Sequence, residues 1–296
     1  IKSSAASDVY KRQVFIETDE RMVTYIACGK VNYQIVGMSS VEYPDLPSFE
    51  QTDRITLNAK ILRDMIRQTV YAVSENTAKP IYTGSLYEIE DGVFKIIAID
   101  GYRMAIRSEN VDSESKNRFV VPGKTQHEVL KLLTDDEENT EIIIGQRHIT
   151  FKIKNYRIIS RLIEGTFIEY KFAIPKETKT EVVINTRTII DAVERMSLLN
   201  NDRIQSPVRC IFSDDEIKLS CTSAVGRAND VISVPIIGES VEIGFNNRYL
   251  LDALKNADTD EIKLILNGSL TAMIVKPVKG DSYLSIVVPM RLANEN

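Results

Sequence analysis

The chain has 296 residues, of which 43% are hydrophobic and 27% charged, a composition typical of a globular protein with length for two or more cores. No apolar run approaches the roughly 20 residues that span a bilayer, and three scattered cysteines exclude a disulfide framework or a zinc site. The net charge of −5 excludes indiscriminate nucleic-acid binding by the whole surface, but it permits a local basic face.

The N-terminal segment has a sequence that we do not expect to belong to the folded protein. Residues Ser3 to Gln13 match, codon for codon, the in-frame translation of a transposase-type sequencing adaptor. We therefore expect residues 1–13 to be adaptor-derived and the native chain to begin near Val14. The chain contains a repeat with a period of about 125 residues, and on that period residues 14–52 would be the C-terminal remnant of a first module. We therefore expect an N-terminally truncated fragment in which roughly 80 residues of that module are missing.

The rest of the chain repeats one plan. Three pairs of segments match at offsets of 127, 124 and 123: Leu57–Val70 with Ile184–Ser197, Glu128–Leu133 with Asp252–Ala257, and Asn32-Tyr33 with Asn155-Tyr156. Three matches near one period argue against chance similarity of amphipathic segments. We expect a second module over residues 53–177 and a third over residues 178–296.

Each module is predicted to be α+β. Apolar and polar residues alternate around tight turns in Tyr87–Ile99 and Glu141–Ile153, and again in Glu216–Cys221 after Asp214-Asp215, which indicates antiparallel hairpins. Two helical stretches per module lie between the hairpins. The first begins after Asn58 as a helix N-cap. It places one apolar stripe at helical spacing, made of Ile61, Leu62, Met65, Ile66, Val70 and Val73.

Basic residues occupy the other side of these helices. Lys60, Arg63 and Arg67 share a face opposite to the apolar stripe, because they are spaced i, i+3 and i+7. Similar pairs follow at the equivalent places: Lys124 with Lys131, Arg187 with Arg195, and Arg248 with Lys255. One such face is usually solvated surface. Four of them in an acidic protein favour a surface that faces a polyanion, and phosphate contacts of this kind give affinity without sequence readout.

Catalytic and cofactor motifs are absent from the sequence. Neither His127 nor His148 lies in a metal-ligating or triad context, and no phosphate-binding glycine loop follows a predicted strand. We therefore expect no enzyme activity, no catalytic residue, no metal and no cofactor. Two alternatives stay open: a hydrolase with a carboxylate site between modules, and a repeat scaffold that binds only proteins.

A family resemblance covers the chain from about Val31 to Leu292. Its segments, in order, are IAIDGYRMAIRSE, FVVPGKTQHEVLKLL, EGTFIEYKFAIP, EIGFNNRYLLDAL and VVPMRL. Together they resemble the bacterial DNA sliding clamp, the β subunit of the replicative DNA polymerase III. The resemblance implies the DNA clamp fold, in which repeated modules place antiparallel sheets outside and two helices inside. It also implies a cytoplasmic homodimeric ring that encircles duplex DNA as a processivity factor. The implied partners are the polymerase III catalytic subunit, the clamp loader and other proteins with clamp-binding motifs.

Carried over by position, the resemblance implies three sets of residues. The DNA-facing set is Lys60, Arg63, Arg67, Lys79, Lys124, Lys131, Arg187, Arg195, Arg248 and Lys255. The peptide-binding pocket would draw on Tyr82, Ile99, Gly101, Tyr102, Arg103, Met104, Ile168, Phe172, Ala173, Asn246, Tyr249, Leu270, Ala272, Val287, Val288, Pro289, Met290 and Arg291. The dimer interface would include Ile35, Leu198 and Leu199.

Four departures from the family pattern bear on the pocket. Ile168 stands where proline is expected, Phe172 where some clamps have arginine, and Tyr102 where many have histidine. Residues Ala293 to Asn296 extend past the usual Arg-Leu ending, next to the predicted pocket. We therefore expect a partner preference that differs from other clamps.

Overall fold

The computed structural model describes residues 13–39, 41, 43, 51–134, 138–199 and 206–292, and for residues 51 and 52 only the backbone. The predictions for residues 1–12 and for the tail from Ala293 to Asn296 fall outside these residues. The chain divides into two compact units, Ile1–Ser48 and Phe49–Asn296. Each unit is described by itself.

The first unit is a three-stranded antiparallel meander. Its strands are β1 (Phe15–Thr18), β2 (Val23–Cys28) and β3 (Val31–Val36), in the order β1-β2-β3. The Asp19 carboxylate accepts hydrogen bonds from the backbone N–H groups of Arg21 and Val23, both at 2.9 Å, and so closes the first turn. All six residues of β3 are exposed, among them Ile35.

The second unit contains the two modules, and each has two strand-to-helix steps with further strands between and after them. The first module comprises β4 (Gln51–Asn58), α2 (Ala59–Val70), η2 (Pro80–Thr83), β5 (Gly84–Glu90), β6 (Val93–Ile99), β7 (Arg103–Asn110), β8 (Asn117–Pro122), α3 (Gly123–Leu132), β9 (Asn139–Gly145), β10 (His148–Ile153), β11 (Tyr156–Arg161) and η3 (Tyr170–Ala173). The second comprises β12 (Thr180–Asn185), α4 (Thr186–Ser197), β13 (Val208–Ser213), β14 (Glu216–Ser223), β15 (Gly226–Ser233), β16 (Ile236–Gly238), β17 (Val241–Phe245), α5 (Asn247–Lys255), β18 (Glu261–Leu266), β19 (Met273–Pro277) and β20 (Tyr283–Val287).

The predicted period is present in the fold. Helices α2 and α4 begin at Ala59 and Thr186, 127 positions apart, and α3 and α5 begin at Gly123 and Asn247, 124 positions apart. The predicted hairpins are also present, since β5 pairs with β6, β9 with β10 and β13 with β14, all antiparallel. The prediction of an α+β fold with repeated modules is therefore confirmed.

Local chemistry explains where these elements begin. Helices α2, α4 and α5 each start after an asparagine whose side chain accepts a hydrogen bond from the first turn: Asn58, Asn185 and Asn246. Asp91 and Gly92 take positive φ angles of 52° and 74° in the turn between β5 and β6, as a tight hairpin turn requires. The predicted apolar stripe of α2 needs two corrections: Ile61 is exposed, and Val73 lies beyond the helix, which ends at Val70.

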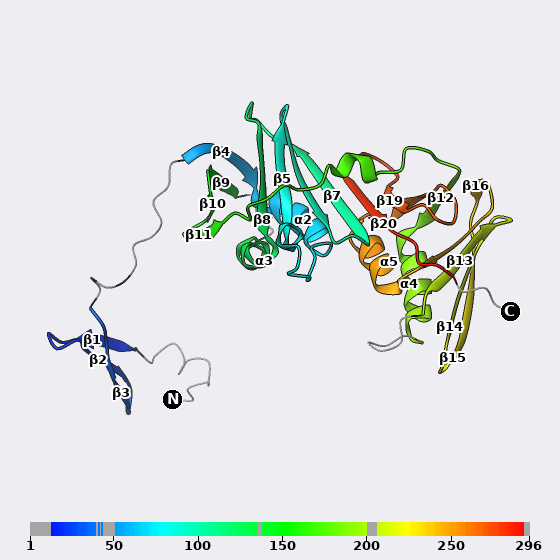
Figure 1. Cartoon of the computed structure of the whole chain (residues 1–296). Coiled ribbons are helices and arrows are strands. Elements are labelled where there is room, and N and C mark those ends of the chain that lie inside the picture. The colour runs from blue at the N-terminus through cyan, green and yellow to red at the C-terminus, as the bar shows by residue number, and fades with distance from the viewer. Residues whose placement is uncertain are drawn as a thin grey trace, which may run out of the picture. The chain divides into compact units, whose positions relative to one another are not determined.

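One sheet runs through both modules. Its nine strands follow the order β16-β12-β18-β19-β20-β7-β6-β5-β8, and the modules join where β20 pairs antiparallel with β7. Each module adds a four-stranded sheet, β11-β10-β9-β4 in the first and β15-β14-β13-β17 in the second. In Figure 1 the four helices lie along the lower side of this unit, and α2 packs on α3 as α4 packs on α5.

Three apolar clusters make up most of the core. One lies inside each module, under its helix pair. The third lies at the β7–β20 seam and combines Met104 and Ile106 of the first module with Ile274 and Ile286 of the second. Because burial of such side chains stabilises by about 1.5–3 kcal/mol each, the seam couples the modules strongly.

Candidate functional site

A hollow of about 630 Å³ lies where the two modules meet, and we call it the junction hollow. The connection that follows α2, the turn between β6 and β7, and the start of α5 form its walls. Its lining residues are Val73, Ser74, Glu75, Asn76, Lys79, Tyr82, Ile99, Asp100, Gly101, Tyr102, Arg103, Ile168, Arg248 and Tyr249.

Arg103 is the charged centre of this wall. Its Nε donates to Asp100 Oδ2 at 2.9 Å, and its Nη1 forms an ion pair with Asp252 on α5. The guanidinium carbon lies 4.6 Å from the ring centroid of Tyr249 and 5.5 Å from that of Tyr71. Since Arg103 is only 7% exposed, its main action is to tie β7 to α5.

Two tyrosines, one exposed and one partly buried, form the floor beside Arg103. The rings of Tyr102 and Tyr249 stack with centroids 5.7 Å apart and an interplanar angle of 19°. Tyr102 is exposed, and burial raises the pKa of the Tyr249 phenol. The backbone N–H of Val288 donates to the carbonyl of Tyr102 at 2.8 Å, so this floor continues into the end of β20. Such a pair offers flat apolar area with polar tips.

Below the seam lies a third tyrosine, Tyr71, which is partly buried. The hydroxyl of Tyr71 lies 3.0 Å from that of Tyr283 and 2.8 Å from Ser285 Oγ, both in the second module. Burial raises the pKa of Tyr71 to about 12. These phenols therefore stay protonated and serve as hydrogen-bonding joints between the modules.

A second hollow, of about 430 Å³, lies at the end of the described chain, and we call it the C-terminal hollow. Its residues are Glu242, Ile243, Gly244, Ser269, Leu270, Met290, Arg291 and Leu292. The Met290 N–H donates to the Gly244 carbonyl at 2.8 Å. A Cβ at Gly244 would lie 2.6 Å from Leu292 Cδ2, so glycine permits the final segment to close on β17.

The structure distributes the predicted pocket residues over both hollows. Tyr82, Ile99, Gly101, Tyr102, Arg103, Ile168 and Tyr249 line the junction hollow, and Leu270, Met290 and Arg291 line the C-terminal hollow. Met104 and Val287 are buried in the core, and Asn246 caps α5. Phe172, Ala173, Ala272, Val288 and Pro289 line neither hollow.

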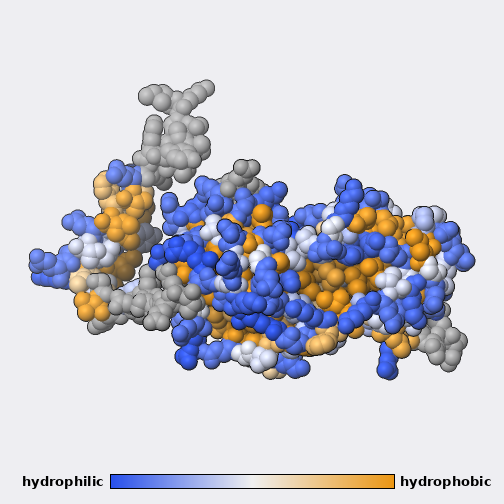
Figure 2. Space-filling model, turned by 90° about the horizontal axis from the view of Figure 1, so that it is seen from above, coloured by the Kyte–Doolittle hydropathy of each residue, from blue (hydrophilic) through white to orange (hydrophobic). Residues whose placement is uncertain are grey.

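Exposed apolar side chains accompany the hollows. Ile168, Phe172, Leu270 and Val288 are all exposed, Phe172 to 84%. On the face seen in Figure 2, apolar surface gathers over the junction and the second module. A large exposed apolar area is typical of a surface that binds a partner.

The sequence did not point to several lining residues. Ser74, Glu75 and Asn76 reach the junction hollow from the connection after α2, and Ser269 and Leu292 reach the C-terminal hollow. Ser74 and Asn76 accept backbone hydrogen bonds, at 3.1 and 2.9 Å, which is turn chemistry. That signal predicts a turn but says nothing about a pocket.

The loop that carries Ile168 and Phe172 is anchored from below. Tyr170, 2% exposed, donates from its hydroxyl to Glu88 Oε1 at 2.7 Å. Burial, and then the bond to Glu88, raise the pKa of the Tyr170 phenol. Arg118 pairs with Glu169 at 2.5 Å on the same loop. These contacts hold η3 against β5 and β8.

The predicted DNA-facing residues lie on or beside the helices, and most have a carboxylate partner. Arg63, Arg67, Lys131, Arg187, Arg195, Arg248 and Lys255 each form an ion pair. Lys60, Lys79 and Lys124 have no ion pair within the part of the chain that the structure describes. The surface is therefore rich in cations but partly neutralised by its own acids.

The residues predicted for a dimer interface are accessible. Leu198 follows α4 and is 82% exposed, and Leu199 packs partly on the core of the second module. Ile35 is exposed on β3 of the first unit.

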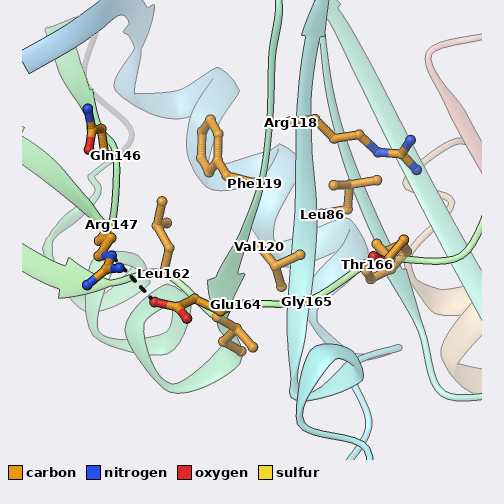
Figure 3. A pocket seen from close by; sticks show the side chains of 12 residues that line it. Leu86, Arg118, Phe119, Val120, Gln146, Arg147, Leu162, Glu164, Gly165 and Thr166 are labelled. Atoms are coloured by element: carbon orange, nitrogen blue, oxygen red, sulfur yellow. Dashed lines mark ion pairs between the residues drawn. The ribbon is translucent and has the colours of Figure 1, made fainter.

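A third hollow, of about 390 Å³, lies on the first module beside β8. Figure 3 shows Phe119, Leu162 and Val120 between Arg147 at one end and Arg118 at the other. Arg147 pairs with Glu164 at 3.7 Å, and Arg118 pairs with Glu169. Its charged groups thus have partners within the protein.

The part of the chain that the structure describes offers neither a metal site nor a membrane-spanning helix. Among the residues that the structure describes, no group of three or more histidine, cysteine, aspartate or glutamate side chains has a geometry that could hold a metal ion. No helix within those residues is long and apolar enough to cross a membrane.

Two family models match the chain. The DNA polymerase III β subunit central domain matches residues 56–169, and the C-terminal domain of the same subunit matches residues 171–291. Together they cover more than half of the chain.

Curated relatives and solved structures agree with these models. The β sliding clamp of Bacillus subtilis is 31% identical over 94% of this chain and 75% of its own length, and that of Halalkalibacterium halodurans is 32% identical over 95% and 76%. The structure of the Bacillus subtilis DNA polymerase sliding clamp superimposes with a TM-score of 0.91 at 30% identity, over 97% of this chain and 78% of that one. A putative DNA polymerase III β subunit from Eubacterium rectale gives 0.90 at 30% identity, over 96% and 79%. The chain therefore belongs to the family of bacterial sliding clamps, the β subunits of DNA polymerase III.

Proposed function

We propose that this sliding clamp acts without catalysis, as a ring that encircles duplex DNA and tethers replication and repair proteins to it. The polymerase III catalytic subunit, the clamp loader and other proteins with clamp-binding motifs are its proposed partners. Because the chromosomal DNA that the ring would encircle lies in the bacterial cytoplasm, we place the protein there. No contact among the described residues favours a hydrolase or a scaffold that binds only proteins.

The junction hollow is the observation that carries the peptide-binding part of this proposal. It joins a stacked tyrosine pair, the neighbouring exposed Ile168 and a few fixed polar groups at a rigid seam between modules. A concave site that combines aromatic and aliphatic anchor surface with polar and charged groups suits a short linear motif with hydrophobic anchors. The C-terminal hollow, with Leu270 and Met290, supplies the second part of the same binding surface.

The basic residues on the helices support the DNA-binding half of the proposal. Their exposed sides present Lys60, Arg187 and Lys255 in equivalent modules, and phosphate contacts through such residues are independent of sequence. We propose that residues 53–177 and 178–296 are the second and third clamp modules, and that residues 14–52 belong to the first. A homodimer closes through Leu198, Leu199 and the surface around Ile35.

Topology is the property that tests the proposal. The full-length protein is loaded by a clamp loader with ATP onto a nicked circular plasmid, and the DNA-bound fraction is measured by gel filtration before and after the plasmid is cut once. A clamp stays on the circle and is lost from the cut DNA, because a ring slides off free ends.

The control is a plasmid that lacks the cutting site and receives the same enzyme. Equal retention on circular and linear DNA would show an ordinary DNA binder. Failure to associate with either form, with loader and ATP active on a known clamp, would also contradict the proposal.

A further inference from the structure

The cations on the helices of the second module are held by carboxylates of the same surface. Lys255 Nζ of α5 lies 2.6 Å from Glu194 Oε1 of α4. Arg187 Nε lies 2.8 Å from Asp191 Oδ1, one turn further along α4. The hydrogen bond from Lys255, and next the charges of Lys255 and Arg187, lower the pKa of Glu194.

A third pair joins the two modules. Arg67 Nη2 of α2 lies 2.5 Å from Asp258 Oδ2, in the connection between α5 and β18. Arg67 also lies 3.6 Å from Asp64 on its own helix. Asp258 lines one open hollow together with Arg187 and Lys255, so the three pairs form a continuous patch.

We call this patch the charge belt and define it by six residues: Arg67, Arg187, Lys255, Asp191, Glu194 and Asp258. Their side chains are 38–76% exposed, so all six are accessible to a ligand in solution. Three positive and three negative charges cancel. The belt therefore lies on the surface assigned above to DNA, yet its own net charge is zero.

We propose that the three carboxylates of the belt are built-in counter-ions that weaken the binding of DNA phosphates to this surface. A phosphate that approaches Arg187 or Lys255 must displace Asp191 or Glu194, which stays nearby and repels it. The inference rests on the proposed function and deepens it. It explains how a clamp with many cations on its helices can hold DNA loosely enough to slide.

Counter-ion release gives the proposal a measurable signature. A free cation that binds a phosphate of duplex DNA releases about 0.9 salt ion, and this sets the slope of log K against log salt concentration. A cation that exchanges a carboxylate for a phosphate releases far less, because the freed carboxylate takes up a salt cation. The belt should therefore add little to the salt slope until its carboxylates are neutralised.

The test is a salt titration of the full chain with a fluorescent 20-base-pair duplex, read by anisotropy. The variant combines Asp191→Asn, Glu194→Gln and Asp258→Asn. We expect its slope to be steeper than that of the unchanged protein by up to about 2.7, and its affinity at 0.1 M salt to be higher by at least about tenfold.

A matched control separates the belt from net charge. Glu141, Glu181 and Glu216 also form ion pairs, but they lie on strands β9, β12 and β14 and line none of the hollows. Their combined change to glutamine alters the net charge by the same amount. The control variant should keep the slope of the unchanged protein, and equal steepening in both variants would overturn the inference.

Two further variants distinguish the inference from the function on which it rests. If Arg187→Ala and Lys255→Ala weaken duplex binding while the carboxylate variant keeps the original slope, the counter-ion proposal is wrong and the DNA-facing assignment stands. If neither the basic nor the acidic substitutions alter duplex binding, the counter-ion proposal and the DNA-facing assignment are both wrong. Circular dichroism melts verify folding, and exposed pairs of this kind contribute little to it.

Discussion

A few side chains at the seam determine the shape of the junction hollow. Arg103 is held by Asp100 and Asp252 and lies over the ring of Tyr249. Tyr249 in turn stacks on Tyr102. A nearly buried guanidinium needs such partners, because an unpaired charge at this depth costs several kcal/mol. The consequence is a tyrosine floor that exists before any partner binds.

Tyr249 is the residue whose loss should reveal this floor. We expect Tyr249→Ala to weaken the binding of a short peptide with a clamp-binding motif by about tenfold, because the stacked ring is worth about 1.4 kcal/mol. Tyr249→Phe keeps the ring and should stay within about twofold of the original affinity. Fluorescence anisotropy with a labelled peptide measures both. An unchanged affinity in the alanine variant would place the peptide elsewhere.

The buried thiol of Cys210 should make the free energy of unfolding depend on pH in the alkaline range. Burial raises the pKa of its thiol from 9.0 to about 12. Above pH 9 the unfolded chain releases this proton while the folded chain retains it. The contribution of this thiol to the free energy of unfolding is therefore fully present below pH 9 and is lost as the pH rises towards 12. The loss from this one group amounts to at most about 4 kcal/mol.

The measurement is urea unfolding at pH 8, 9 and 10. The unfolding free energy of Cys210→Ala should fall less steeply with pH than that of the unchanged protein. Val208→Ala, which shortens a buried side chain on the same strand and changes no titratable group, should leave the slope unaltered. Parallel slopes for all three proteins would contradict the assignment.

The helices owe their positions to repeated local signals. Asn58, Asn185 and Asn246 cap three of them, and each cap satisfies N–H groups that the helix leaves unpaired. The buried side of α2 carries Leu62, Met65 and Ile66. The cap therefore fixes where α2 begins, and the buried side fixes how it faces the sheet.

The cap of α2 can be tested directly. Asn58 Oδ1 accepts from the N–H groups of Lys60 and Ile61 at 2.9 and 3.4 Å. We expect Asn58→Ala to lower the unfolding free energy by about 1 kcal/mol, whereas Asn58→Asp keeps an equivalent acceptor and should change it by less than about 0.5 kcal/mol. Urea denaturation compares the three proteins. A loss of equal size in both variants would show that the cap is not the cause.

The second unit behaves as one body because its largest sheet passes through both modules. The pairing of β20 with β7 and the apolar cluster beneath it join the two halves. The hydrogen bonds of Tyr71 to Tyr283 and Ser285 reinforce the same seam. The hollows at this seam are therefore part of a rigid frame.

If the apolar packing at the β7–β20 seam is disrupted, the two modules should unfold in separate transitions. Ile286 is 3% exposed and packs in the seam cluster, so Ile286→Asp places a charge in an apolar environment. We expect two separate transitions in scanning calorimetry, where the unchanged protein shows one for residues 53–292. Ile237→Asp, on the exposed side of β16, should keep a single transition. A single transition in the seam variant would mean that the modules are coupled elsewhere.

Much of the fold could be predicted from the sequence because its signals are local. The module repeat follows from matching segments, the hairpins from Asp-Gly and Asp-Asp turns, and the start of α2 from Asn58. Each depends on residues a few positions apart. The family resemblance depends on the same segments, and the family models match residues 56–169 and 171–291.

The tertiary structure alone decided which distant residues meet. Arg67 pairs with Asp258, 191 positions away, and Arg103 with Asp252, 149 positions away. No local period records such a pairing, because it depends on how strands and helices pack once the apolar faces are buried. The sequence by itself determined the modules, their helices and their basic residues. Folding determined the seam, the hollows beside it and the pairing of Arg67 with Asp258 and of Lys255 with Glu194, since each requires groups from far along the chain to lie within a few ångströms.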